Sequence, residues 1–204
     1  MNVGTGTALG TLTLVSGGTI ENGIIADAGS GLAFTGGTLS GVTYDGTMNL
    51  SSSDAYVYVT NGLTTAGIGG SGAGTINLTG QSSALYSEGT ETLNTATVDV
   101  GNNSTDYIYN YDASAAAVLT LGPTLIIDQT GSNVQLTGYE DRSGSGIVNE
   151  GTINAEVSGT LYETALNFTN DGTISVTNGD KFYDYYNFTN AAGATLSIDR
   201  KSVV

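Results

Sequence analysis

The stretch NFTNDGTISVTNGD, residues 167–180, has a similar copy on each side of it. The preceding copy is GIVNEGTINAEVSG at residues 146–159, and the following copy is NFTNAAGATLSID at residues 187–199. Aligned on their shared asparagines, the copies follow one another at nearly equal intervals of about 21 residues, a length typical of one coil of a solenoid. One copy could arise by chance in a chain rich in glycine and threonine. Three copies at a nearly fixed interval indicate a repeated structural unit.

Two residue types recur at fixed places in these copies. They are the asparagines Asn149, Asn170 and Asn190 and the glycines Gly151, Gly172 and Gly193. We expect the glycines to allow a backbone turn that a Cβ would strain. The asparagine amides can bond local backbone at the same turn. In stacked coils they can also bond one another and form an asparagine ladder.

Looser copies of the unit extend towards the N-terminus. The aligned elements are GTMNL at 46–50, GTINL at 74–78, ATVDV at 96–100, AVLTL at 117–121 and two earlier elements that begin at Thr19 and Thr38. The interval is shortest between Thr19 and Thr38 and longest between Thr47 and Thr75. Natural solenoids tolerate such drift when the insertions fall in turns.

Apolar and polar residues alternate within each element. Ile76 and Leu78 point one way from a strand, whereas Thr75 and Asn77 point the other way. Parallel stacking of such strands, about 4.8 Å apart, joins their apolar faces into one core. We therefore predict that residues 1–204 form one all-β domain, a single-stranded parallel β-helix. We expect about nine or ten coils of roughly 21 residues, wound right-handed according to the crossover rule.

Composition excludes several kinds of function. The chain has 19 acidic and 4 basic residues, for a formal net charge of −15. Nucleic acid is excluded as a partner because phosphate binding needs clustered lysine and arginine. No run of about 18 apolar residues occurs, so we predict no membrane insertion. The chain lacks cysteine and histidine, which removes thiolate and histidine chemistry, and we predict no metal and no cofactor.

Tyrosine is the most conspicuous residue type. The chain has 12 tyrosines and no tryptophan. The candidate ligand-binding residues are Tyr107, Tyr109, Tyr111, Tyr183, Tyr185 and Tyr186, in DYIYNYD and KFYDYYNF; Tyr56 and Tyr58 share one face of DAYVYV. One interpretation is that these rings cover exposed strand surface and pack on their neighbours. The other is an aromatic platform for a sugar or a protein, because tyrosine combines flat apolar area with a hydroxyl.

The acids do not form a catalytic pattern. Arg142 follows Glu140 and Asp141 in one turn, and no second acidic group is identifiable on an adjacent coil. We therefore predict no catalytic residues and a non-enzymatic protein. Glu163 and Asp184 occupy matching positions in LYETALNFTN and DKFYDYYNFTN. If either side chain points inward, we expect local strain or a change of strand register.

At NFTNDGTISVTNGD, NFTNAAGATLSID and GGTLSGVTYDGT, the chain resembles the β-strand-repeat segments of large bacterial surface proteins. These include autotransporter passengers and haemagglutinin-like adhesins with pectin-lyase-like β-helices. The resemblance covers most of the chain. It implies a segment of a longer repeat protein, located outside the cell or on the bacterial surface, with its export signal elsewhere. It also implies a stalk or an adhesive surface, and it transfers no catalytic residue.

Three function hypotheses follow. The first is a structural or adhesive segment whose partner is a glycan or the surface of a host or neighbouring cell. The second is a carbohydrate-binding or polysaccharide-cleaving β-helix. The third is a self-assembling unit, because the open ends of a solenoid expose unpaired strand edges for end-to-end association. Ice binding is a further alternative, which the irregular second row of outward residues, such as Asn49, Asn77 and Asp99, disfavours.

Overall fold

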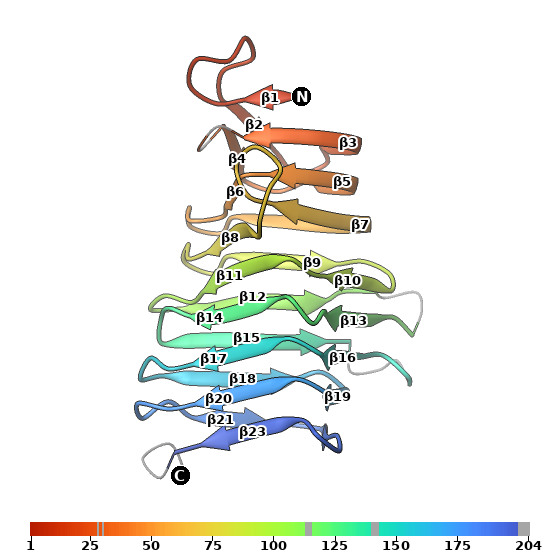
Figure 1. The fold of residues 1–204 in the computed structure, drawn as a ribbon, viewed down its shortest axis with the longest axis vertical. Coiled ribbons are helices and arrows are strands. Elements are labelled where there is room, and N and C mark those ends of the chain that lie inside the picture. Colours follow the sequence, from red (N-terminus) through yellow and green to blue (C-terminus); the bar gives the residue numbers. More distant parts are fainter. Residues whose placement is uncertain (28, 30, 113–115, 140–142, 200–204) are drawn as a thin grey trace.

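The computed structural model describes residues 1–27, 29, 31–112, 116–139 and 143–199. Throughout this described part, the regular secondary structure is β-strand, and the paired strands of the three sheets are parallel. The strands stack into an elongated body with β1 and β23 at opposite ends (Figure 1). The predicted all-β parallel solenoid is thus confirmed. These residues contain no helical segment that could serve as a membrane span.

Two of the sheets have nine strands each and run the length of the solenoid. Sheet A contains β1 (Asn2–Val3), β3 (Thr19–Asp27), β5 (Thr38–Asp45), β7 (Tyr56–Ala66), β9 (Ala84–Ser87), β12 (Thr105–Asn110), β15 (Asn133–Gly138), β18 (Thr160–Thr164) and β21 (Phe182–Asp184). Sheet B contains β2 (Leu12–Leu14), β4 (Leu32–Phe34), β6 (Thr47–Asn49), β8 (Gly74–Leu78), β11 (Ala96–Val100), β14 (Ile126–Gln129), β17 (Thr152–Ala155), β20 (Thr173–Val176) and β23 (Thr195–Ile198).

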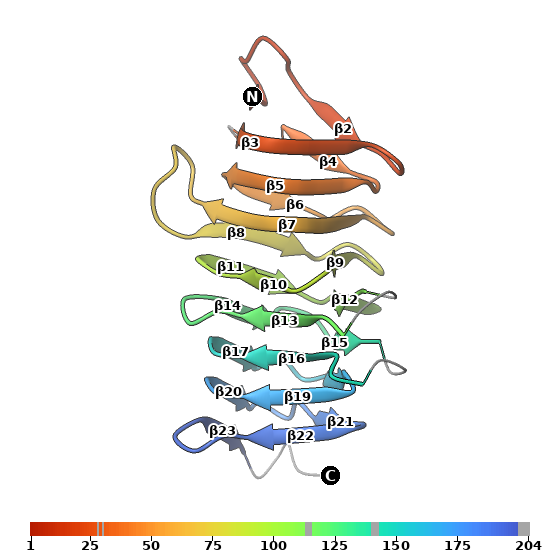
Figure 2. The ribbon, with the colours of Figure 1, turned by 90° about the vertical axis from the view of Figure 1, so that its right-hand side faces the viewer.

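Sheet C is shorter and forms a third side of the C-terminal half, where it faces the viewer in Figure 2. Its strands are β10 (Glu91–Leu93), β13 (Val118–Leu121), β16 (Gly146–Asn149), β19 (Asn167–Asn170) and β22 (Asn187–Asn190). In this half the chain passes through sheets A, C and B in turn. The repeat NFTNDGTISV therefore supplies one strand to sheet C and the next strand to sheet B.

In the N-terminal half, long strands of sheet A bend around a corner. In β3 the bend is at Asn22 and Gly23, whose φ angles are 58° and 82°. In β7 it is at Asn61 and Gly62, with φ angles of 55° and 93°. Asparagine and glycine are the residues that adopt this left-handed backbone most readily. The side chain of Glu91, at the start of β10, accepts a hydrogen bond from the Gly62 N–H, so sheet C begins beside the second half of β7.

The core lies between the sheets and follows the alternation of the strands. Fully buried side chains occur at almost every coil, among them Leu39, Val57, Ile76, Val98, Leu119 and Ile174. At the C-terminal end, Phe182, Phe188 and Leu196 are only partly buried and Ile198 is 39% exposed. No described strand follows β21, β22 or β23 in its sheet, so this last inward face remains partly open.

Strand pairing corrects part of the alignment made from the sequence. Thr97 of β11 pairs with Ile126 of β14, so the counterpart of ATVDV is not AVLTL. The AVLTL strand, β13, belongs to sheet C. Thr19 and Thr38 do pair with each other, but in sheet A instead of sheet B. The error arose because all three sheets use the same alternation of polar and apolar residues.

The recurring asparagines lie at the ends of β16, β19 and β22. The Asn149 Nδ2 donates to the Asn170 Oδ1 at 2.8 Å, and the Asn170 Nδ2 donates to the Asn190 Oδ1 at 2.7 Å. The same two Nδ2 atoms also reach the backbone carbonyls of Thr173 and Thr195. Asn149 and Asn170 are fully buried. These amides therefore link coil to coil and hold the turn into sheet B.

The recurring glycines act for two different reasons. A Cβ on Gly172 would overlap the carbonyl oxygen of Gly151 in the preceding coil, and a Cβ on Gly151 would lie 2.5 Å from the Leu125 carbonyl oxygen. Close stacking, and not a left-handed backbone, requires glycine at these two positions. Gly193 instead has a φ of +96° and open space around it. Gly193 is not the register equivalent of Gly172. Gly172 directly precedes Thr173, whereas the residue that directly precedes Thr195, the partner of Thr173, is Ala194.

We predict that Gly172→Ala lowers the free energy of unfolding by about 1–3 kcal/mol, because the added methyl must push two coils apart. Urea denaturation at pH 7 measures the effect. The matched control is Asp171→Ala at the exposed neighbouring position, which should change stability by less than about 0.5 kcal/mol. Equal denaturation midpoints for the two variants would contradict the close-stacking explanation.

Candidate functional site

The outer face of sheet A carries a column of tyrosines in register. Tyr58, Tyr86 and Tyr109 are direct neighbours on β7, β9 and β12. Adjacent strands lie about 4.8 Å apart, so side chains in such a column must meet. The Tyr58 and Tyr86 rings stack, with centroids 4.8 Å apart and an interplanar angle of 24°. The Tyr86 and Tyr109 centroids are 5.7 Å apart.

Three more rings extend this column sideways. The tyrosine layer, as we call the resulting set, consists of Tyr56, Tyr58, Tyr86, Tyr109, Tyr111 and Tyr139, joined by ring contacts of 4.8–6.0 Å. Most of these pairs are tilted or perpendicular, as the ring quadrupole favours. All six rings are half-buried. Burial raises the pKa of Tyr58 and of Tyr86, which keeps both hydroxyls protonated.

Small residues make room for the layer. A Cβ on Gly36 would lie 2.7 Å from the phenol end of Tyr56, so that ring lies directly over the glycine. Ala84 pairs in register with Tyr56 on one side and with Tyr107 on the other. Its side chain points outward, as that of Tyr86 does, yet Ala84 is only 2% exposed. Neighbouring rings therefore cover it. The layer packs onto its sheet while its outer surface faces solvent.

A second set of tyrosines lies nearer the C-terminus and is more exposed. The C-terminal tyrosine group consists of Tyr162, Tyr183, Tyr185 and Tyr186. Tyr162 stacks on Tyr183 with centroids 5.8 Å apart and an angle of 20°, and its centroid is 6.4 Å from that of Tyr185. The exposed fractions of Tyr183, Tyr185 and Tyr186 are 40%, 60% and 41%.

A hollow of about 430 Å³ lies beside the C-terminal tyrosine group. It is lined by Thr105, Gln135, Tyr162, Thr164, Tyr185 and Tyr186. Its floor includes Gln135, whose Nε2 donates to the Thr164 Oγ1 at 2.9 Å. None of the lining residues that the structure describes is charged. The hollow therefore combines aromatic walls with uncharged hydrogen-bonding groups.

The six tyrosines selected from the sequence all come from sheet A or from the residues that directly follow its strands. Tyr109 and Tyr111 join the tyrosine layer, and Tyr183, Tyr185 and Tyr186 belong to the C-terminal tyrosine group. Tyr107 lies in register between Ala84 and Gln135. Sequence reasoning missed Tyr86, Tyr139 and Tyr162, together with the hollow. These are single tyrosines in their segments, and only the strand register brings them beside the others.

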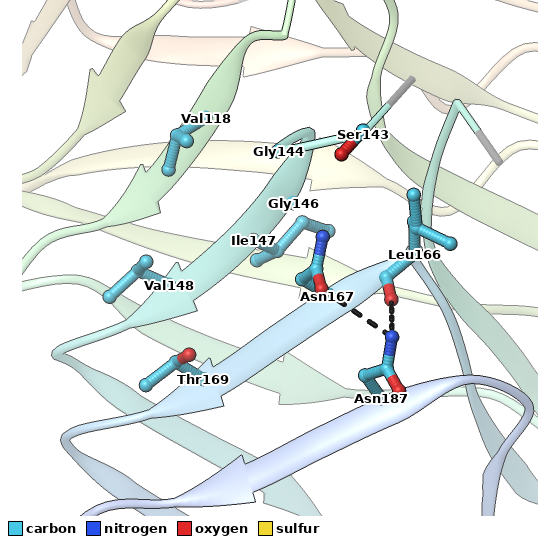
Figure 3. A pocket seen from close by; sticks show the side chains of 10 residues that line it. All are labelled: Val118, Ser143, Gly144, Gly146, Ile147, Val148, Leu166, Asn167, Thr169 and Asn187. Atoms are coloured by element: carbon cyan, nitrogen blue, oxygen red, sulfur yellow. Dashed lines mark hydrogen bonds between the residues drawn. The ribbon is translucent and has the colours of Figure 1, made fainter. Parts of the chain in front are cut away.

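Another hollow, of about 670 Å³, lies on the outer face of sheet C (Figure 3). Its two asparagine side chains already bond the protein's own backbone. The Asn167 Nδ2 donates to the Ser145 carbonyl at 2.8 Å, and the Asn187 Nδ2 donates to the Leu166 carbonyl at 3.0 Å. We therefore assign this hollow a structural role.

Sheet B presents two regular outward rows. One row is Thr47, Thr75, Thr97, Ile126, Thr152, Thr173 and Thr195, and the other is Asn49, Asn77, Asp99, Asp128, Asn154, Ser175 and Ser197. Burial and the neighbouring Asp128 raise the pKa of Asp99. The two carboxyl groups interrupt the second row at its centre. Ice binding stays the weaker alternative, because a hydroxyl lattice would have to span this charged interruption.

Several acids point into the core. Asp106 is fully buried and accepts hydrogen bonds from the Ser83 N–H at 2.7 Å and the Ser83 hydroxyl at 3.0 Å. Asp180 is also fully buried and accepts from the Lys181 N–H. Burial raises the pKa of each to about 6. Both groups anchor backbone, and neither faces a surface hollow.

Glu163 is the acid most strongly affected by its surroundings. It is fully buried, and it pairs in register with Leu136 on one side and Asp184 on the other. Burial, and then a hydrogen bond with the Asp184 side chain, raises the pKa of Glu163 to about 9. The Glu163 Oε1 accepts from the Ala165 N–H at 2.6 Å. The change of register expected for an inward acid does not occur, because Glu163 is protonated and hydrogen-bonded.

No described group of three acids, histidines or cysteines is placed to hold a metal ion. Glu140, Asp141 and Arg142, the acid–base turn of the sequence, lie outside the described residues. Comparison with protein-family models, with curated proteins and with solved structures gave no match for this chain. The chemistry of the surface is therefore the basis for assigning a function.

We predict that Glu163→Gln stabilises the protein above neutral pH. The folded-state pKa of Glu163 is about 9, above its ordinary value of 4.5. Between these values the folded state retains a proton that the unfolded state loses, so stability falls as pH rises, by up to about 1.4 kcal/mol per pH unit. The glutamine variant lacks this slope. Urea denaturation between pH 7 and pH 8.5 isolates the effect, because Asp106 and Asp180 titrate lower.

Asp171→Asn is the control, since it removes an exposed acid from the same coil, between β19 and β20. We expect it to keep the wild-type pH slope. An unchanged slope in Glu163→Gln would mean that Glu163 is ionised in the folded protein at neutral pH.

Proposed function

We propose that this chain is a non-enzymatic structural and adhesive segment of an extracellular bacterial surface protein, and that sheet A is its adhesive side. The observation that carries the proposal is the tyrosine layer, six half-exposed rings in continuous contact across neighbouring coils. Tyrosine is enriched at the centres of protein interfaces because it gives large contact area with few rotatable bonds.

The solenoid suits a stalk. Every coil bonds to the next through sheet ladders and, in the C-terminal half, through the asparagine ladder. We propose a right-handed winding of about nine or ten coils, consistent with the crossover rule. Such a rod places one chemical pattern along one side over its whole length. We propose in addition that it is part of a longer repeat protein at the cell surface, as its resemblance to β-strand-repeat segments implies.

Charge distribution also supports an adhesive sheet A. The chain has a net charge of −15, yet the two outward columns from β7 to β21 are uncharged. They are Tyr58, Tyr86, Tyr109, Thr137 and Thr164, and Tyr56, Ala84, Tyr107, Gln135, Tyr162 and Tyr183. An uncharged aromatic strip loses little hydration free energy on contact with another surface.

The distribution of acids supports a non-enzymatic role. The carboxyl groups with the largest upward pKa shifts, those of Asp106, Glu163 and Asp180, belong to fully buried residues. Hydrolysis or elimination on a polysaccharide requires acid and base groups that reach the substrate. The carbohydrate-binding form of the second hypothesis is favoured by the hollow on sheet A, whereas the cleaving form has no comparable support.

Adhesion can be tested with protein-coated beads retained on intact bacterial cells, on mucin-coated glass and on plant cell-wall fragments. We expect wild-type beads to be retained on at least one surface, and Tyr58→Ser/Tyr86→Ser/Tyr109→Ser to reduce retention by about tenfold or more. The control is Thr75→Ser/Thr97→Ser/Thr152→Ser on the outer face of sheet B, which should bind like wild type. Circular dichroism verifies folding, and Tyr→Phe at the same three positions retains the ring packing.

Wild-type retention no greater than that of beads carrying an unrelated acidic protein would overturn the adhesive proposal. Equal retention of the serine variant and wild type would remove the tyrosine layer from it.

End-to-end association is proposed as a secondary property. In the isolated segment, the partly buried Phe182, Phe188 and Leu196 of the last described coil provide apolar contact, and the edges of β21, β22 and β23 provide hydrogen-bonding groups. Because like-charged rods repel, we expect light scattering to show association that grows with salt concentration. Phe188→Asp should abolish it. A monomer at every salt concentration would remove this property.

A further inference from the structure

We infer that the hollow on the outer face of sheet A, between β12 and β21, is a binding site for an uncharged saccharide. This inference rests on the proposed adhesive role of sheet A and specifies one partner for it. The site contains residues that the tyrosine layer does not: Thr105, Gln135, Tyr162, Thr164, Tyr185 and Tyr186.

The hollow follows from the strand register. On β12 the outward positions are Tyr107 and Tyr109, and their partners on β15 are Gln135 and Thr137. The next strand returns to an aromatic residue, because Gln135 pairs with Tyr162. The outer surface is therefore lower at β15 than on either side of it. Thr105, Gln135, Tyr162 and Thr164 come from strands β12, β15 and β18, whereas Tyr185 and Tyr186 come from the segment between β21 and β22.

The lining matches the two kinds of surface on a sugar ring. A sugar presents a flat face of C–H groups, which packs on an aromatic ring, and a rim of hydroxyls, which need hydrogen-bonding partners. Tyr162 and Tyr185 supply the rings, and their planes are inclined by 42°. The hydrogen bond from Gln135 to Thr164 holds an amide and a hydroxyl in place on the floor. Cavities of about 300–1,000 Å³ are typical of small-molecule sites, and this one has about 430 Å³.

Charge selects among saccharides. None of the described residues that line the hollow is a lysine or an arginine, so a carboxylated or sulfated sugar would find no cation among them. The net charge of −15 repels polyanions over longer distances. A cationic ligand would find no carboxylate among these described lining residues either. The absence of charge on an otherwise acidic molecule therefore points to a neutral glycan.

The exposed Tyr185 is the residue to change, because it is 60% exposed and lies just after β21. Its removal should leave the fold intact. We expect isothermal titration calorimetry to detect binding of laminarin, galactomannan or dextran, with polygalacturonate as the acidic probe at matched concentration. Tyr185→Ala should raise the Kd for the neutral polysaccharide by about tenfold or more. Tyr185→Phe retains the ring and should stay within about threefold of wild type.

Ile126→Ala is the matched control, since it removes an exposed apolar side chain from the outer face of sheet B and none from the hollow; it should leave saccharide binding unchanged. Equal affinity of Tyr185→Ala and wild type would overturn the assignment of the site. Preference for polygalacturonate would overturn the ligand class.

The two proposals can fail separately. If no neutral polysaccharide binds while beads still adhere through the tyrosine layer, the saccharide inference is wrong and the adhesive role stands. If saccharide binds at the hollow but Tyr58→Ser/Tyr86→Ser/Tyr109→Ser beads adhere like wild type, the role of the layer is wrong and the site stands. If the wild-type protein shows no adhesion and no saccharide binding, both proposals are overturned.

Discussion

Parallel pairing of each strand with its counterpart in the next coil is the constraint on which the rest of this protein depends. Because the pairing is in register, equivalent side chains fall into columns about 4.8 Å apart. A column of leucine and isoleucine makes the core, a column of asparagine makes the ladder, and a column of tyrosine makes the outer layer. One backbone rule thus creates interior, turn and surface. The glycines at 151 and 172 are required by the same rule, because the coils approach too closely there for a Cβ.

The three sides of the solenoid differ in the chemistry of their columns. From β7 to β18, two outward columns of sheet A are uncharged and rich in tyrosine, whereas sheet B presents threonine beside a mixed row with Asp99 and Asp128. The outer face of sheet C directs the amides of Asn167 and Asn187 back to its own backbone. The inward acids are accommodated by protonation or by backbone hydrogen bonds. Of these surfaces, sheet A is the one that we propose as the side that meets a partner.

Much of the architecture could be predicted from the sequence, because alternation and a repeated turn are local patterns. The alternation in GTINL and the recurrence of Asn170 predicted a parallel solenoid. The assignment of strands to sheets could not be predicted, since AVLTL and ATVDV have the same alternation but belong to sheets C and B. The candidate site depends on that assignment. Tyr86 pairs in register with Tyr58 on one side and Tyr109 on the other. The number of residues from Tyr58 to Tyr86 differs from the number from Tyr86 to Tyr109, and no local sequence pattern predicts either spacing. Glu163 and Asp184 were recognised as a matched pair, but protonation in the core follows only from the depth at which Glu163 is buried.

The bent strands of the N-terminal half have a consequence for how such a molecule can change. In β3 and β7 a pair of left-handed residues turns the corner within one strand, whereas later coils replace the corner with a separate strand of sheet C. Residues can therefore be added or deleted at that vertex without disturbing either flat side. The loop between β7 and β8, which projects at the left of Figure 2, shows the same freedom at another vertex. Variation in length is thus confined to the corners between the sheets of the solenoid. The sheets can keep the spacing between their strands through successive rounds of duplication and divergence.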